Sequence, residues 1–196
     1  MLIPIRCASC GSDGALLCDA CRRRLVPAPP LPAPPGTDGA RALFVYDEIG
    51  ASVVGALKFA NAHRLVRWLG PELAALAPSC PDMVTWAPAT PANCRRRGYD
   101  QGELLARQVA ARLGVNARRL LGRGRDTPQT ERGRSGRAAG PRLLCRRAAP
   151  SRVLVVDDVL TTGATAAAAA RLLRRNGAES VEILAVAWTP PPGFED

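Results

Sequence analysis

The segment VLVVDDVLTTGAT, residues 153–165, places two acidic side chains beside a run of hydroxyls and a glycine. Its first residues are apolar and mostly β-branched, which predicts a strand buried on both faces of a parallel sheet. Asp157 and Asp158 follow. Because successive side chains of a strand point to opposite faces, we expect the two acids to serve one ligand only if the strand ends there. The segment then leads into the start of a helix through Thr161, Thr162, Gly163, Ala164 and Thr165.

This order of residues suits a sugar phosphate. The free N–H groups and the dipole at a helix N-terminus favour an anion such as phosphate. Two carboxylates beside that anion would repel it unless they face a neutral or cationic partner, and a ribose diol or Mg2+ meets that condition. We therefore predict a ribose-phosphate clamp at the carboxyl end of a strand, where open parallel sheets bind their ligands. The alternative is a buried strand followed by an ordinary hydroxyl-rich helix start.

Four cysteines near the N-terminus, Cys7, Cys10, Cys18 and Cys21, form the pattern C-x2-C-x7-C-x2-C. Two C-x2-C turns can place four thiolates tetrahedrally around Zn2+, and the segment is too short to fold on a core of its own. Two disulfides are the alternative, but the N-terminus lacks the apolar stretch of a secretion signal, which predicts a reducing, cytoplasmic location. We therefore expect a structural zinc site.

The elements that must position these residues alternate along the chain. Expected strands cover 42–47, 83–88, 152–158 and 181–188, and expected helices cover 50–60, 65–76, 102–114 and 164–177, the second with a break at Gly70–Pro71. Such alternation predicts an α/β fold with a mostly parallel sheet and flanking helices. The prolines of residues 27–36 predict an extended spacer. The expected division is a zinc knuckle (1–26), a linker (27–39), the α/β domain (40–190) and a tail (191–196).

The net charge indicates an anionic partner but does not distinguish a phosphorylated metabolite from nucleic acid. The 196 residues have a formal net charge of +10, and Lys58 is the sole lysine, so nearly all of the positive charge is arginine. An arginine-rich surface attracts phosphorylated metabolites or nucleic acid, whereas an arginine-favouring coding bias would give the same composition without a function. No apolar run is long enough to predict a membrane span.

The segment 153–165 resembles the loop with which type I phosphoribosyltransferases bind phosphoribosyl pyrophosphate (PRPP). The resemblance extends over most of the chain to the ComF (GntX-like) family of competence-associated phosphoribosyltransferase-like proteins. That family combines a four-cysteine zinc motif with Y-D-x…L-K-F, then R-R-G-Y/F-[ND]-Q…L-L-A, then the PRPP loop. The present sequence has CASC, CDAC, YDEIGASVVGALKFA, PANCRRRGYDQGELLA and the loop in that order. The resemblance implies a type I phosphoribosyltransferase-like fold with a mobile hood.

By this resemblance, Asp157 and Asp158 would hold the ribose hydroxyls of PRPP and take part in catalysis, while the loop from Thr161 to Thr165 would bind the 5′-phosphate. The run CRRRGYDQ follows the strand expected at 83–88, where type I enzymes carry their pyrophosphate loop. There Arg96, Arg97 and the Gly98 amide would neutralise the pyrophosphate leaving group, with help from Mg2+. A solvated basic run is the alternative interpretation of these arginines.

The glycine- and arginine-rich segment 122–142 resembles the hood of the family, which would close over the site and exclude water. Thr127, Gln129 and Arg137 match the family pattern, whereas Arg132 stands where the family often has Leu and Gly140 where it often has Asn. The alternative is an RGG-like loop that binds a nucleic-acid backbone.

Two classes of function follow from the resemblance. The first is transfer of ribose 5-phosphate from PRPP to an unidentified acceptor, with release of pyrophosphate. The second is a non-catalytic PRPP- or nucleotide-binding accessory protein in single-stranded DNA uptake during natural competence, with a competence helicase as partner. The zinc knuckle, the net charge and the arginine-rich loop suit the second class.

Overall fold

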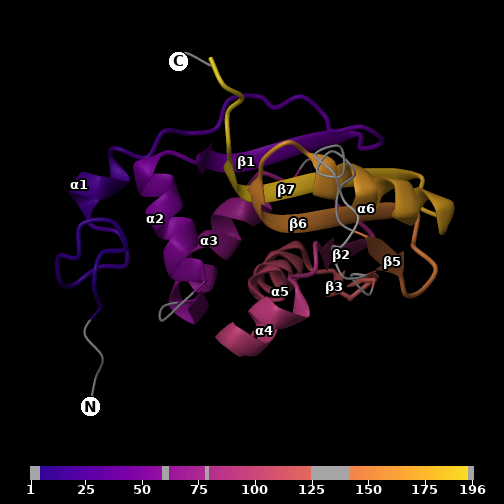
Figure 1. Cartoon of the computed structure of the whole chain (residues 1–196), viewed down its shortest axis with the longest axis horizontal. Coiled ribbons are helices and arrows are strands. Elements are labelled where there is room, and N and C mark those ends of the chain that lie inside the picture. The colour runs from indigo at the N-terminus through magenta and orange to yellow at the C-terminus, as the bar shows by residue number, and fades with distance from the viewer. Residues whose placement is uncertain (1–4, 59–61, 78–79, 125–141, 194–196) are drawn as a thin grey trace, which may run out of the picture.

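The computed structural model describes residues 5–58, 62–77, 80–124 and 142–193. Five parallel strands form the central sheet in the order β1-β7-β6-β2-β3 (Figure 1). The strands are β1 (Gly39–Val45), β2 (Met83–Trp86), β3 (Asn116–Ala117), β6 (Arg152–Leu160) and β7 (Ser180–Trp188). An antiparallel pair, β4 (Leu121–Arg123) and β5 (Leu143–Cys145), forms a second small sheet. The predicted α/β class with a mostly parallel sheet is confirmed.

Helices cover both faces of the sheet, as Figure 1 shows. The helices α2 (Glu48–Leu57), α3 (Ala62–Ala75) and α5 (Gln101–Leu113) pack on one face, and α6 (Ala164–Arg175) packs on the other. Two short helices are α1 (Asp19–Arg22) and α4 (Pro91–Arg97). In the described part of the chain, no helix has both the length and the apolar character that a membrane crossing requires.

Residues of β6 alternate between two apolar cores, which is the pattern of a strand buried on both sides. Leu154 and Val156 belong to the core with α2, α3 and α5, whereas Val153 and Val155 belong to the core with α6. The buried run read from the sequence therefore lies at the centre of the molecule, between β2 and β7.

The prediction that this strand ends at Asp157 and Asp158 is wrong. Strand β6 continues to Leu160 because β7 remains paired with it as far as Trp188. It is β2, on the other side, that ends early: Trp86 pairs with Val156, and β2 goes no further. Both acids therefore lie on a stretch of β6 that β2 has left uncovered.

Two further differences concern helices. The expected break at Gly70–Pro71 does not occur, since α3 runs through Pro71. The arginine run contains a short helix, α4, which begins in the ordinary way: the Thr90 hydroxyl caps it by accepting from the Asn93 N–H, and Pro91 takes the first position.

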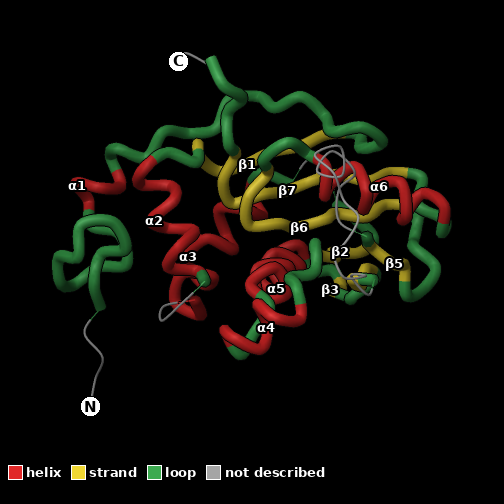
Figure 2. Tube along the Cα trace, in the orientation of Figure 1, coloured by secondary structure: helices red, strands yellow, loops and turns green. Residues whose placement is uncertain are grey.

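The proline-rich segment lies along the outer edge of β1 (Figure 2). The Val45 N–H donates to the Val26 carbonyl, the Ala28 N–H donates to the Leu43 carbonyl, and Pro27 is bridged to Phe44 in antiparallel sense. Val26, Ala28 and Leu31 also pack against the core that contains α6. The segment expected to be a linker thus contacts the sheet directly, while the domain boundaries themselves stay a prediction.

Candidate functional site

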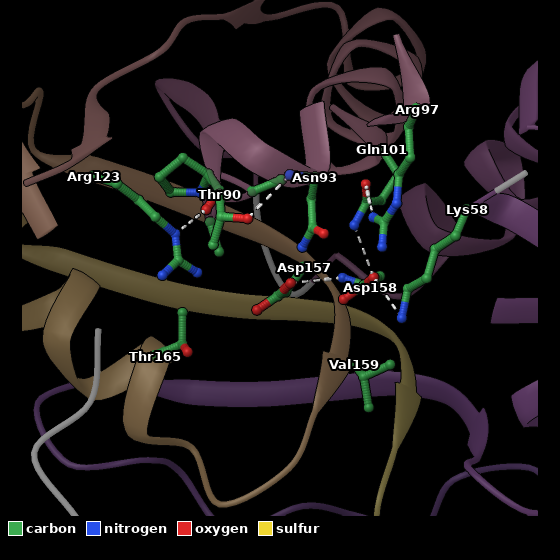
Figure 3. A pocket seen from close by; sticks show the side chains of 13 residues that line it. Lys58, Thr90, Asn93, Arg97, Gln101, Arg123, Asp157, Asp158, Val159 and Thr165 are labelled. Atoms are coloured by element: carbon green, nitrogen blue, oxygen red, sulfur yellow. Dashed lines mark hydrogen bonds and ion pairs between the residues drawn. The ribbon is translucent and has the colours of Figure 1, made fainter. Parts of the chain in front are cut away.

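A polar cavity of about 250 Å3 lies at the carboxyl ends of β2 and β6 (Figure 3). The chain leaves β2 toward β3 on one side and leaves β6 toward β7 on the other, so the cavity lies at a topological switch point of the sheet. Ligands of open α/β sheets bind at such points. The polar residues that line the cavity are Lys58, Thr90, Asn93, Arg97, Gln101, Arg123, Asp157, Asp158 and Thr165.

Asp157 and Asp158 both line this cavity although they are consecutive residues of one strand. Strand residues alternate in direction, so an internal position in the sheet would separate them. The early end of β2 opposite Val156 removes that separation, because it opens the edge of β6 on which both acids lie. The Asp158 backbone N–H also donates to Oδ1 of Asp157 at 2.8 Å, which orients the Asp157 side chain.

The two acids lie in different electrostatic surroundings. Burial raises the pKa of Asp157 well above its ordinary value of 3.8, and the negative charge of Asp158 raises it further. Asp158, by contrast, has a cation and an amide next to it. Its Oδ2 lies 3.4 Å from Nζ of Lys58 and accepts a hydrogen bond from Nε2 of Gln101 at 3.1 Å. Two carboxyl groups with such different neighbours are suited to different tasks in binding or proton transfer.

The raised pKa of Asp157 predicts how the stability of the folded state depends on pH. An acid whose pKa is higher in the folded state binds a proton more tightly there, so stability falls as pH rises from the ordinary carboxyl value toward the folded pKa. Asp157→Asn removes this loss. We expect the melting temperature of the variant to rise relative to that of the wild type between pH 4 and pH 8. Parallel profiles, measured by circular dichroism across that range, would contradict the assignment.

Three elements bring positive charge to the cavity. Lys58 follows the last turn of α2, Arg97 ends α4, and Arg123 ends β4. Nη1 of Arg97 donates to Oε1 of Gln101 at 2.7 Å, and Nε of Arg123 donates to the Pro88 carbonyl at 2.9 Å. The Arg97 Nε is buried without a hydrogen-bond partner among the described residues. A buried N–H of this kind needs an acceptor, and a bound anion would supply one.

The run Gly98-Tyr99-Asp100-Gln101 holds this arrangement in place. Gly98 adopts a positive φ of 80°, which ends α4 and lets α5 begin three residues later. The Tyr99 hydroxyl donates to the Leu57 carbonyl at the end of α2. The Asp100 carboxylate caps α5 through the Gly102 N–H and also accepts from the Ala89 N–H after β2. From the sequence alone, no defined contact was predicted for Tyr99, Gln101 or Lys58.

Of the predicted 5′-phosphate loop, only Thr165 lines the polar cavity. Thr161 and Thr162 instead line a neighbouring apolar cavity of about 660 Å3, formed largely by prolines and Trp188. Gly163 has a φ of +74°, and a Cβ built on it would come within 3.1 Å of Pro34. The Ala164 N–H donates to the Thr162 hydroxyl at 3.4 Å. The loop thus borders both cavities, and Gly163 leaves no room for a side chain beside Pro34.

Of the residues predicted to bind pyrophosphate, only one lines the polar cavity. Arg97 lines the cavity, whereas Arg96 is exposed and donates to the Asn93 side chain, and Gly98 is the helix end described above. The predicted hood residues Thr127, Gln129 and Arg137 lie outside the described residues, as do Arg132 and Gly140. Thr90, Asn93 and Arg123 were not singled out as site residues, although Asn93 lies in the motif PANCRRRGYDQGELLA and Arg123 lies in the segment that resembles the hood.

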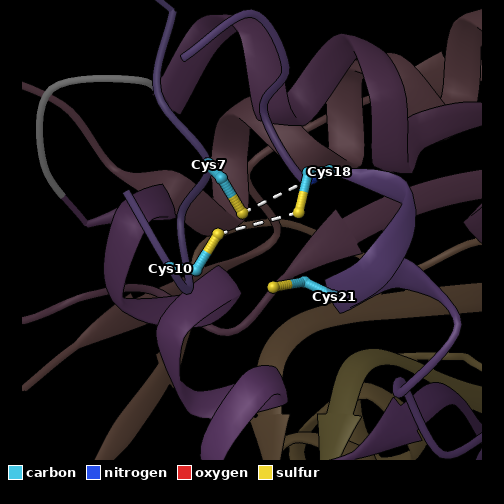
Figure 4. Close-up of side chains that lie close together, drawn as sticks. All are labelled: Cys7, Cys10, Cys18 and Cys21. Carbon is cyan, nitrogen blue, oxygen red and sulfur yellow. Dashed lines mark hydrogen bonds between the residues drawn. The ribbon is translucent and has the colours of Figure 1, made fainter. Parts of the chain in front are cut away.

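The four cysteines of the N-terminal motif meet at one point (Figure 4). Their sulfur atoms all lie within 4.8 Å of one another, and the Sγ atoms of Cys10 and Cys18 are 3.7 Å apart. Sulfurs bound tetrahedrally at zinc–sulfur distances of about 2.3 Å would be separated by roughly 3.8 Å. Four cysteine sulfurs in this arrangement could hold a metal ion such as zinc.

The shifted pKa values of the cysteine thiols also favour a bound cation. Burial raises the pKa of the Cys7 thiol, but hydrogen bonds from backbone N–H groups outweigh it and lower that pKa to about 6. A hydrogen bond with Ser9 lowers the pKa of Cys21, but burial and the neighbouring thiols raise it to about 11. The four groups cannot all ionise without mutual repulsion, and a divalent ion removes that repulsion.

Residues 100–193 match the family model described as Phosphoribosyl transferase domain. The match includes both acids of the cavity, Gln101 and Thr165. Over these residues the chain is therefore similar to phosphoribosyltransferase domains, and the parallel sheet with its switch-point cavity agrees with that similarity.

The chain is also similar to Competence protein F of Haemophilus influenzae. The two are 34% identical over 101 residues, which cover 47% of this chain and 44% of the relative. The chain therefore matches less than half the length of that relative. The two matches confirm the resemblance to competence-associated phosphoribosyltransferase-like proteins.

Solved structures with a similar arrangement include glutamine PRPP amidotransferase from B. subtilis. That structure has a TM-score of 0.45 and 25% identity over 62% of this chain and 26% of its own. The purine phosphoribosyltransferase from Pyrococcus horikoshii Ot3 has a TM-score of 0.41 and 16% identity over 67% of this chain and 75% of its own.

Proposed function

We propose that the polar cavity binds PRPP and that the chain transfers ribose 5-phosphate from it to an acceptor, with release of pyrophosphate. The observation that carries the proposal is the pair Asp157 and Asp158 at the open edge of β6, surrounded by Lys58, Arg97 and Arg123. Carboxyl groups accept hydrogen bonds from a ribose diol, and the surrounding cations attract phosphate groups.

The ligand is proposed to lie with its ribose on the two acids and its pyrophosphate toward Arg97 and Arg123. The 5′-phosphate is assigned to the loop from Thr161 to Thr165, at the N-terminus of α6, where N–H groups favour an anion. Mg2+ bound with the pyrophosphate would offset its charge. Catalysis would consist mainly of positioning the anomeric carbon and stabilising the departing pyrophosphate.

Calorimetric titration with PRPP and Mg2+ tests binding, and pyrophosphate release in the presence of a panel of nucleobases and amines tests transfer. We expect a saturable site of one PRPP per chain. Absence of binding would overturn the proposal. Binding without release across the panel would favour a non-catalytic PRPP-binding role.

The placement of the arginines makes a sharper prediction. Arg97→Met should weaken binding of magnesium pyrophosphate more than tenfold, since it removes a charged donor from the cavity. Arg96→Met removes the same charge from an exposed position of the same helix and should change the affinity by less than twofold. Titration of both variants with pyrophosphate checks this, and equal losses would show that only net charge matters.

A role in DNA handling is the second candidate, favoured by the similarity to a protein named for competence and by the net charge of +10. Such a protein would act with single-stranded DNA and a competence helicase, with or without turnover of PRPP. An electrophoretic shift with single-stranded DNA should then weaken steeply as salt rises. Lack of a shift at low salt would count against this candidate.

A further inference from the structure

Gln101 is one of few polar residues buried among the described part of the chain, with 8% of its surface exposed. It is the first residue of α5. Both ends of its amide contact cavity residues: Oε1 accepts from Arg97 at 2.7 Å, and Nε2 donates to Asp158 at 3.1 Å. Figure 3 shows the amide lying between these two side chains. Gln101 therefore joins the group assigned to pyrophosphate with a group assigned to ribose.

We propose that Gln101 is a positioning residue that holds Arg97 and Asp158 apart and oriented, so that the two ends of the phosphoribosyl ligand are recognised together. This inference rests on the proposed function. Arg97 and Asp158 carry opposite charges and line the same cavity. Without a neutral group between them they would approach each other and form an ion pair, which would neutralise both ligand-binding groups.

Only an amide satisfies both neighbours. Its oxygen accepts from a guanidinium while its nitrogen donates to a carboxylate, whereas a carboxylate in its place could not donate and an alkyl group could do neither. The contacts also leave ligand-facing atoms available. Lys58 and Gln101 both contact Oδ2 of Asp158, so Oδ1 is the oxygen that can accept a ribose hydroxyl. The contact with Gln101 uses only Nη1 of Arg97, so it occupies one of the three guanidinium nitrogens.

The position of Gln101 is fixed by the backbone around it. Asp100 caps α5 and holds the Ala89 N–H of the segment after β2, so the start of α5 is tied to that segment. A rigidly mounted amide can fix the orientation of its partners before the ligand arrives, and such preorganisation improves affinity without adding a contact to the ligand.

The test is Gln101→Leu, titrated separately with magnesium pyrophosphate and with ribose 5-phosphate. We expect the affinity for each fragment to fall about tenfold, although Gln101 is assigned a contact with neither. Gln108→Leu places the same substitution on the same helix away from the cavity and should leave both affinities within twofold. In an Arg97→Met background, Gln101→Leu should cause no further loss of pyrophosphate affinity, because the side chain through which it acts is gone.

Gln101→Glu serves as a second variant should the leucine variant fail to fold, because it keeps the shape and places an acid favourably at a helix N-terminus. It retains an acceptor for Arg97 but repels Asp158, so ribose 5-phosphate affinity should fall at least tenfold. If the wild type binds PRPP and either fragment binds Gln101→Leu within twofold of wild type, this inference is overturned and the proposed function stands. If the wild type binds no PRPP, the proposed function falls and this inference with it.

Discussion

Replacing both Asp157 and Asp158 with asparagine should lower the affinity for PRPP by at least about tenfold, since a hydrogen bond to a charged group contributes about 1.5–3 kcal/mol and at least the one to Asp158, the partner of Lys58, is lost. Asparagine keeps the size of each side chain but presents a donor where the ribose hydroxyls need an acceptor. The affinity is measured by calorimetric titration with PRPP and Mg2+.

In the absence of ligand, the same double variant should melt no more than a few degrees below the wild type. The pKa of Asp157 is raised because the group is buried. A neutral amide in its place therefore avoids the free-energy cost of burying a charge in the folded state. Asp158 loses its ion pair with Lys58, whose side chain is 26% exposed, and partly exposed ion pairs contribute little to stability.

Glu72→Gln, an acid-to-amide change on the outer face of α3, controls for the loss of negative charge. It should bind PRPP as the wild type does. A double variant that unfolds instead of losing affinity alone would show that the acids hold the sheet together, and the site assignment would then fail.

The second large effect concerns the cysteine cluster. Cys10→Ser should abolish retention of about one zinc ion per chain and lower the melting temperature by about 10 °C, because structural zinc supplies folding energy to a segment without its own core. Zinc content is measured by elemental analysis after gel filtration, and unfolding by calorimetry.

The loss should extend beyond the knuckle. Cys7, Leu17 and Cys21 belong to the same apolar core as α2 and α3, so a disordered knuckle exposes part of that core. Cys80→Ser, at an exposed cysteine outside the cluster, should change neither zinc content nor melting. A Cys10→Ser protein that melts like the wild type would mean that the four cysteines hold no structural metal.

The features predicted correctly from sequence are those that a local pattern encodes. The alternation of helix and strand periods predicted the α/β class, and the unbroken apolar run predicted the buried strand β6. The cysteine spacing predicted a cluster, and the structure brings the four sulfur atoms within 4.8 Å of one another. The PRPP-loop pattern also drew attention to Asp157 and Asp158. Both line a cavity at a switch point of the sheet, and their role in PRPP binding stays a prediction.

What sequence could not give depends on contacts between distant segments. The end of β6 was misplaced because β7 holds it extended to Leu160, and strand pairing is not visible in a local run. Lys58 and Gln101 both contact Asp158, yet one lies 100 residues and the other 57 residues earlier in the chain. Arg96 and Arg97 are neighbours in an unbroken arginine run, and only the orientation of α4 separates the one in the cavity from the one outside.

The placement of residues 26–28 against β1 has a consequence for how copies of the protein behave in solution. A strand at the border of a sheet ordinarily offers its free backbone groups to any other extended chain, which is a route to aggregation. Here residues 26–28 occupy that border at Leu43–Val45, and Pro27 has no N–H with which to continue the ladder outward. At this end of β1 another extended chain cannot pair with the sheet directly, which should reduce association between copies of the protein there.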